Sequence, residues 1–275
     1  MTVLTRRGVL LTTAAAVTFA GSAPIAWAQD IKELVIAYNV NLPSWNPTVG
    51  ASAVNPTIQG LYQSVFDLFI AQDTDLTQTG GLITDWGWNS DKTKVHMTVR
   101  DGVTWHNGDA MTAEDVAWSL ERAADPDGGN PIQFIWSTIG NLQVDGNKIT
   151  GDVLRFEPTI FKWMSFLTGY VLPKAYIEKV GVEGFEAAPI GTGPYMVEKY
   201  ERNAFVRLKA NENYWGGAPE FKSVTIKFVT DAAGRVAEVE SGNSHVTLEM
   251  PYEEYDRLKG GVLVGTAAPV SDIGM

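Results

Sequence analysis

The segment from residue 80 to residue 122 constrains the fold of this chain most, because strand, turn and helix patterns follow one another within it. Apolar residues occupy every second position from 95 to 99, which predicts a strand with one buried and one solvent-facing side. Turns are expected at Asp101-Gly102 and Asn107-Gly108, since glycine tolerates positive φ. The segment therefore predicts a half-buried strand that ends in two consecutive tight turns.

A capped helix is expected directly after these turns. Thr112 stands at the N-cap position, and Asp115 three residues later completes a capping-box pattern. Val116, Leu120 and Ala123 then have the spacing of an inward-facing apolar stripe. These patterns explain how the segment folds and leave its function open.

The rest of the chain also alternates strand and helix patterns. Residues 34–38 and 224–228 read as strands, the second with strict alternation. Asn55-Pro56 is typical of a helix cap followed by a first-turn proline, and apolar residues keep helical spacing from 58 to 69. Asp145-Gly146-Asn147 between two apolar runs predicts a hairpin.

The N-terminus has the pattern of a signal peptide over residues 1–28. Arg6 and Arg7 precede a short apolar run, and Ala26-Trp27-Ala28 forms a small-x-small cleavage site before Gln29. The paired arginines favour the twin-arginine route, and the general secretory route stays open because Val9 stands where phenylalanine is usual. The run is shorter than the ~20 apolar residues that a membrane anchor needs.

Composition agrees with export. The 275 residues contain no cysteine, so stability in an oxidising compartment rests on an ordinary core, and no lipid-bearing cysteine follows the cleavage site. A freely diffusing exported protein needs an outer barrier, which favours the periplasm. The formal net charge of −11 argues against nucleic acid and anionic membranes as partners.

Several motifs occur together in a fixed order. They are Arg100-Asp101-Gly102, Trp105, His106-Asn107-Gly108, Thr112-Ala113-Glu114-Asp115-Val116, Pro189-Ile190-Gly191-Thr192-Gly193-Pro194-Tyr195, Asn211-Glu212-Asn213-Tyr214-Trp215-Gly216-Gly217 and the stretch 231–245. This set resembles the signature motifs of the peptide/nickel-binding family (family 5) of extracytoplasmic solute-binding proteins of ABC importers. The resemblance covers residues 34–258.

The resemblance implies an α/β fold, namely the N-terminal lobe of a type II periplasmic-binding-protein-like fold. A mixed sheet with flanking helices is then expected from residues 29–52 and 171–265, with a smaller inserted α+β subdomain at 53–170. Family members are roughly twice as long and close a second lobe over the solute. The chain is thus expected to be truncated, with residues 266–275 starting the hinge strand and the second lobe missing. A fragment of a longer protein, a truncated reading frame and a one-lobed variant are the three explanations, in that order.

The function implied by the resemblance is periplasmic binding of an oligopeptide-like solute and its delivery to the permease subunits of an ABC transporter. An oligosaccharide or another small organic solute is the alternative within this class. A sensor adaptor and a periplasmic hydrolase are alternatives from other classes. No cofactor is implied, and the full-length protein is expected to be a monomer.

No catalytic or metal-binding constellation stands out in the sequence. The three histidines, His96, His106 and His245, are far apart and lack metal-ligand spacing. Neighbouring glutamates such as Glu238 and Glu240 are better explained by surface solvation than by glycoside hydrolysis. The sequence therefore predicts neither catalytic nor metal-binding residues.

Aromatic residues are the better site candidates, because eight of the nine tryptophans lie beyond residue 28. The resemblance implies that Trp45, Trp136 and Tyr170 lie on one concave face, and core packing is the alternative for each. The backbone of Asn39 to Asn41 is expected at the floor of that face. Gln133 stands where relatives carry a cationic pocket residue. A solute-facing Trp136 also predicts that Trp136→Ala leaves thermal unfolding nearly unchanged.

Overall fold

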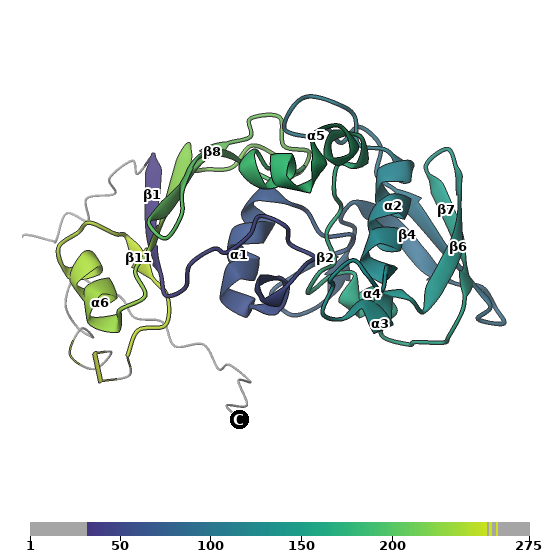
Figure 1. The fold of residues 1–275 in the computed structure, drawn as a ribbon, viewed down its shortest axis with the longest axis horizontal. Helices are drawn as coiled ribbons and strands as arrows, with labels where there is room; N and C mark the ends of the chain where they lie inside the picture. The colour runs from purple at the N-terminus through teal and green to yellow at the C-terminus, as the bar shows by residue number, and fades with distance from the viewer. Residues whose placement is uncertain (1–31, 252, 255–256, 258–275) are drawn as a thin grey trace, which may run out of the picture. The chain divides into compact units, whose positions relative to one another are not determined.

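The computed structural model describes residues 32–251, 253, 254 and 257 of the chain (Figure 1). The predicted signal peptide at 1–28 and the predicted hinge strand at 266–275 lie outside the described residues. Within the described part of the chain, no helix combines the length and apolar character that crossing a bilayer requires.

A five-stranded sheet joins the N-terminal strand to four strands from the second half of the chain. Its order is β11-β1-β10-β9-β8, and β1 runs parallel to both β10 and β11 while β8, β9 and β10 are antiparallel neighbours. The bounds are β1 Glu33–Tyr38, β8 Tyr195–Glu201, β9 Phe205–Ala210, β10 Ser223–Phe228 and β11 Val246–Thr247. The alternation predicted for residues 224–228 is confirmed, because Val224, Ile226 and Phe228 are buried.

A separate four-stranded antiparallel sheet has the order β4-β5-β7-β6. Its strands are β4 Ile83–Trp88, β5 Lys94–Val99, β6 Ile139–Asp145 and β7 Lys148–Val153, and a two-stranded ribbon pairs β2 Ala71–Gln72 with β3 Gln78–Thr79. The predicted hairpin is confirmed between β6 and β7, where Gly146 takes a φ of +60° that other residues rarely adopt. The alternating apolar residues of β5 all face the core.

Two helices begin where the capping patterns predict. Helix α2 (Ala113–Ala124) has the complete capping box of Thr112 and Asp115, and α1 (Pro56–Val65) has Asn55 as its N-cap. The remaining helices are η1 Ala51–Val54, α3 Gln133–Trp136, α4 Ile160–Trp163, α5 Lys174–Ala187 and α6 Ala232–Glu240.

Helix α1 is shorter than its apolar spacing predicts. The spacing continues to Phe69, but the helix ends at Val65 and Phe66 is extended. The cause lies in the Pro189–Tyr195 motif, whose glycines close on this helix end. A Cβ atom on Gly191 would lie 2.0 Å from the Val65 carbonyl oxygen, so only glycine allows the approach.

Asp67, just beyond α1, joins two of the sequence motifs. Its carboxylate accepts hydrogen bonds from Thr192 Oγ1 (2.8 Å), Tyr214 Oη (2.9 Å) and Trp215 Nε1 (2.8 Å). Burial raises the pKa of Asp67, and these three hydrogen bonds act in the opposite direction. Two of the motifs that carry the family resemblance thus meet at one partly buried carboxylate.

Two hydrophobic cores accompany the two larger sheets. One includes the buried residues of β5 and α2, and the other includes those of β1, β10 and α1. Helix α1 therefore packs with the five-stranded sheet, although its residues fall inside the range 53–170 predicted for the inserted subdomain. The mixed sheet with flanking helices is confirmed, and the domain limits stay a prediction.

Candidate functional site

Three strand ends meet at one edge of the five-stranded sheet. Because β1 is parallel to β10 and β11, all three strands end on the same side. The chain leaves β1 towards α1 and leaves β10 into α6, and Figure 1 shows these helices on opposite sides of β1. Crevices at such a divergence are where open α/β sheets bind their ligands. This edge is the first candidate site.

Asn39 follows β1 directly and lies at this edge. Its side-chain amide donates a hydrogen bond to Glu249 Oε2, and Thr57 Oγ1 donates to Glu249 Oε1 at 3.2 Å. Thr57 belongs to the first turn of α1, where the helix dipole favours a carboxylate. The Glu249 side chain thus joins the end of β1 and the start of α1 to a segment about 200 positions further along the chain.

Arg235 fixes the backbone around Glu249. This arginine on α6 is only 5% exposed and donates to the carbonyl oxygens of Val229 (3.0 Å), Thr230 (3.0 Å), Leu248 (3.1 Å) and Glu249 (2.9 Å). The guanidinium group therefore ties the chain beyond β10 to the chain beyond β11. Glu249 itself has a φ of +49°, a conformation that such contacts help to hold.

The free hydrogen-bonding group at this edge is an acceptor. Asn39 Oδ1 is buried and has no hydrogen-bond partner among the described residues. The orientation of the amide is set by Glu249, since a carboxylate accepts and only the NH₂ group of Asn39 can donate to it. A buried acceptor left unpaired costs about 1–3 kcal/mol, so a donor placed here is stabilised.

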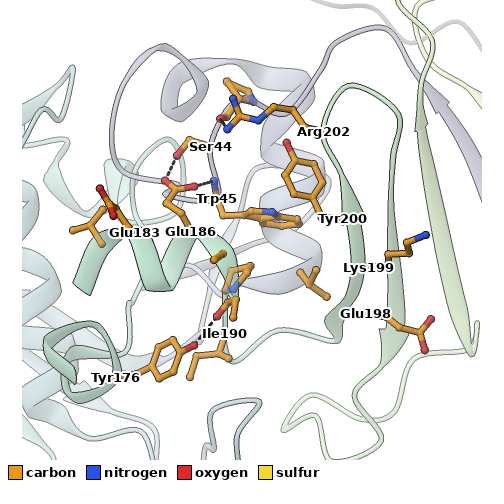
Figure 2. Close-up of a pocket in the computed structure, with 16 residues that line it drawn as sticks. Ser44, Trp45, Tyr176, Glu183, Glu186, Ile190, Glu198, Lys199, Tyr200 and Arg202 are labelled. Carbon is orange, nitrogen blue, oxygen red and sulfur yellow. Dashed lines mark hydrogen bonds between the residues drawn. The ribbon is translucent and has the colours of Figure 1, made fainter. Parts of the chain in front are cut away.

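Asn41 and Trp45 lie in the loop that follows Asn39. Asn41 is exposed. Trp45 is 1% exposed, packs edge-on against Tyr200 at 5.6 Å between ring centroids, and its backbone N–H donates to Glu186 at 2.6 Å. Figure 2 shows Trp45, Tyr200 and Glu186 beside a cavity, which has a volume of about 740 Å³ and lies between the loop, α5 and β8.

Of the other three predicted site residues, Trp136 and Tyr170 are buried and Gln133 is half-buried. Trp136 is 1% exposed and donates from Nε1 to Thr168 at 2.8 Å, and Tyr170 is fully buried. Gln133 Nε2 donates to the carbonyl oxygen of Ala124 at 2.5 Å. Trp136 belongs to the core beside the four-stranded sheet, whereas Tyr170 belongs to the other core together with Trp45.

The three aromatic side chains expected on one concave face are buried, and a shared face stays a prediction. Trp45, Trp136 and Tyr170 are core side chains divided between two clusters, because each ring finds apolar neighbours and two of them also find polar partners within the protein. Solute contact by Asn39, Asn41, Trp45, Gln133, Trp136 and Tyr170 stays a prediction. Among these six, Asn39 combines a place at the strand ends with an unpaired acceptor.

Sequence reasoning did not select Glu249, Thr57 or Arg235 for this edge. The Asn55-Pro56 cap was a usable signal for Thr57, since it places that residue in the first helical turn. No local pattern indicates Glu249, which meets Asn39 across 210 positions of sequence. Within the described residues, no group of three or more acidic, histidine or cysteine side chains is arranged to hold a metal ion.

Comparison with known proteins identifies the family. The family model for bacterial extracellular solute-binding proteins, family 5, matches residues 77–269. The chain belongs to this family. The sequence resemblance is thereby confirmed, and relatives in the family are binding proteins rather than enzymes.

Curated relatives give more detail. The chain is 28% identical over 247 residues to the glutathione-binding protein GsiB of Salmonella paratyphi A, a match over 87% of this chain and 46% of the relative. GsiB of Pectobacterium atrosepticum is 26% identical over 245 residues, covering 88% and 46%. The chain thus spans about half the length of the curated relatives it matches.

Solved structures agree on the fold. A dipeptide-binding protein from Pseudoalteromonas sp. SM9913 in complex with Met-Leu superposes with a TM-score of 0.76 at 22% identity, over 83% of this chain and 49% of that chain. NikZ from Campylobacter jejuni in complex with Ni(L-His) gives a TM-score of 0.76 at 23% identity, over 84% and 46%. The α/β fold of the type II periplasmic-binding-protein class is thereby confirmed.

Proposed function

We propose that this protein is a periplasmic solute-binding component of an ABC importer that binds a peptide-like solute and delivers it to a membrane permease. The observation that carries the proposal is the edge where β1, β10 and β11 end, with Asn39 and Glu249 beside the first turn of α1. Membership of an extracellular solute-binding family supports it.

A peptide-like solute suits the groups at this edge. Peptides carry N–H donors along their backbone and at their amino terminus, and Asn39 Oδ1 is an acceptor without a partner among the described residues. One relative is named as a glutathione-binding protein, and one structural neighbour holds the dipeptide Met-Leu. Both compounds are peptides with several N–H groups.

Capture would follow a shift between open and closed states. A solute moves such an equilibrium only by the difference between its affinities for the two states. A donor that pairs with Asn39 Oδ1 in the closed state alone would supply part of that difference. The closed form would then be the form that the permease recognises.

The test is calorimetric titration with glutathione and with Met-Leu. We expect saturable binding of at least one of them, and Asn39→Ala to weaken it by about tenfold, the equivalent of one hydrogen bond of ~1.4 kcal/mol. Asn147→Ala, in the β6–β7 hairpin, is the matched control and should bind normally. Unchanged affinity in the Asn39 variant, or turnover of the peptide into products, would contradict the proposal.

A further inference from the structure

Strand β8 is the last strand on one side of the five-stranded sheet. It pairs only with β9, so one of its edges is open. Within the described part of the chain, the backbone groups of residues 197–200 make no hydrogen bond beyond the β8–β9 pair. An open edge of this kind is a template to which another extended chain can add.

The cavity of about 740 Å³ runs along this open edge. Four consecutive residues, 197–200, line it. Successive side chains of a strand point to opposite faces, so a cavity lined by four in a row lies beside the backbone edge rather than over one face. The space next to the unpaired backbone groups is therefore preformed.

The walls of the cavity offer apolar surface. The hydroxyls of Tyr176 and Tyr200 are already bound to the carbonyl oxygens of Ala188 (2.9 Å) and Leu42 (2.6 Å), which leaves their rings towards the cavity. Val182 lines the same space and is 48% exposed. An apolar side chain of an added strand would cover these groups.

The charged groups of the lining give the added strand a direction. Among the described residues, Lys199 is paired with Glu201 at 2.5 Å, whereas Glu183 has no hydrogen-bonding or ionic partner and Arg202 has only a 3.5 Å contact with the Pro43 carbonyl. Figure 2 shows Glu183 on α5 and Arg202 just beyond β8, on two different walls of the cavity. A basic residue at one end and an acidic residue at the other would match them.

Edge protection is the competing explanation of the same strand. The pairing of β8 shifts between Val197 and Lys199, and a bulge with neighbouring charges discourages indiscriminate pairing of strands. Protection accounts for the bulge and the charges, but it does not account for a cavity of about 740 Å³ with exposed apolar groups beside them. A bulged strand edge next to a cavity favours partner strands whose side chains fit that cavity.

We propose that the open edge of β8 binds an extended segment of a partner protein, in which a basic, an apolar and an acidic residue alternate with small polar ones. The segment adds as a sixth strand, with its apolar side chain between Tyr176 and Tyr200 and its basic side chain towards Glu183. This surface is separate from the strand-end site, because β9 and β10 lie between β8 and β1, a span of roughly 14 Å. The inference is therefore independent of the proposed function.

The probe is the peptide acetyl-Lys-Thr-Val-Thr-Glu-amide, compared with two versions N-methylated on alternate residues. N-methylation removes donors from one edge of the peptide and keeps its side chains. We expect the parent peptide to bind, one methylated version to bind at least about tenfold more weakly than the other, and the amides of residues 197–200 to gain protection from hydrogen exchange. The protection localises binding to the edge.

Side-chain variants test how the added peptide is aligned along β8. Glu183→Lys, at an exposed position, should weaken binding of the parent peptide by about fivefold. Val182→Asp should weaken that binding further. Glu178→Lys makes the same charge change on the same helix outside the cavity lining and should bind normally. These positions are exposed, so thermal unfolding of the variants should stay close to that of the parent protein.

Three outcomes would overturn the inference. The first is equal binding of both methylated versions, which would exclude backbone pairing. The second is no binding up to about 1 mM peptide. The third is concentration-dependent self-association in ultracentrifugation with residues 197–200 protected before peptide is added, because a second copy of this chain would then occupy the edge.

Discussion

At the scale of single residues, His106 links two sequence motifs through hydrogen bonds. Gly191 N–H donates to His106 Nδ1 at 3.1 Å, so the proton lies on Nε2, which donates to the Gly193 carbonyl at 3.0 Å. The backbone N–H of His106 donates to the Gly191 carbonyl at 2.9 Å. The neutral imidazole ring thus joins the His106-Asn107-Gly108 turn to the Pro189–Tyr195 motif.

The burial of the neutral His106 ring predicts that the folded protein loses stability in acid. Burial lowers the pKa of His106 to about 4 from 6.5, so between these values the unfolded state binds more protons. The stability that the neutral His106 ring contributes is fully present above about pH 6.5 and is lost as the pH falls towards 4. The loss in the free energy of unfolding amounts to about 3 kcal/mol. Urea unfolding at pH 7 and pH 4.5 should show a smaller pH effect in His106→Gln than in the exposed control His96→Gln. An equal pH effect in both variants would contradict the assignment.

Trp136 gives a second prediction at this scale. A solute-facing ring predicts that Trp136→Ala hardly changes thermal unfolding, but the ring is 1% exposed and packs against Phe69 at 5.7 Å. Removing it should lower the free energy of unfolding by about 3–5 kcal/mol. Phe134→Ala, on the same helix and 58% exposed, should cost about 0.5 kcal/mol or less. A small effect of Trp136→Ala in chemical denaturation would restore the first expectation.

At the scale of elements, the sequence patterns predicted those strands and helix starts that depend on interactions between neighbouring residues. The alternation in β5 and β10 and the caps of α1 and α2 are each set by neighbouring residues, and the structure confirms them. The end of α1 at Val65 was missed because its cause, Gly191, lies far along the chain. Sequence alone also could not separate core from surface aromatics, since the same side chains serve both and only their neighbours decide.

The capping box of α2 is the element whose strength is most directly testable. Thr112 Oγ1 accepts from the Asp115 N–H at 3.3 Å, and Asp115 Oδ2 accepts from the Thr112 N–H at 2.9 Å. Asp115 Oδ1 also accepts from the backbone N–H of Lys174 at the start of α5 (3.1 Å). Thr112→Ala should therefore lower the free energy of unfolding by about 1 kcal/mol in urea titrations. Thr112→Ser keeps the hydroxyl and should behave as the parent, and an equal loss in both variants would assign the effect to the methyl group.

At the scale of the whole molecule, a few long-range polar contacts hold the parts that bear the sites. Arg235 fixes the strand ends beside Asn39 and Glu249, and Asp67 fixes the loops that follow α5 and β9. Family membership was predictable because the motifs lie along the sequence in a fixed order, and the family model that matches residues 77–269 confirms it. The partners within each contact were not predictable, since they are set by the packing of the folded chain.

Asp67 carries the prediction at this scale. It lies beyond the last residue of α1, which packs in one core, and it accepts from Trp215, which packs against the other core. Asp67→Asn removes the negative charge and replaces one acceptor oxygen by an NH₂ group, so the three hydrogen bonds lose their charged acceptor and at least one of them must reverse its direction or break. Because hydrogen bonds to a charged group contribute about 1.5–3 kcal/mol each, while removing a buried charge recovers part of this, a net loss of about 1–3 kcal/mol is expected. Denaturant unfolding followed by tryptophan fluorescence measures it, with the exposed Asp73→Asn as control. Equal stability of the two variants would mean that burial of the Asp67 charge offsets its hydrogen bonds, and Asp67 would then make no net contribution to joining the two cores.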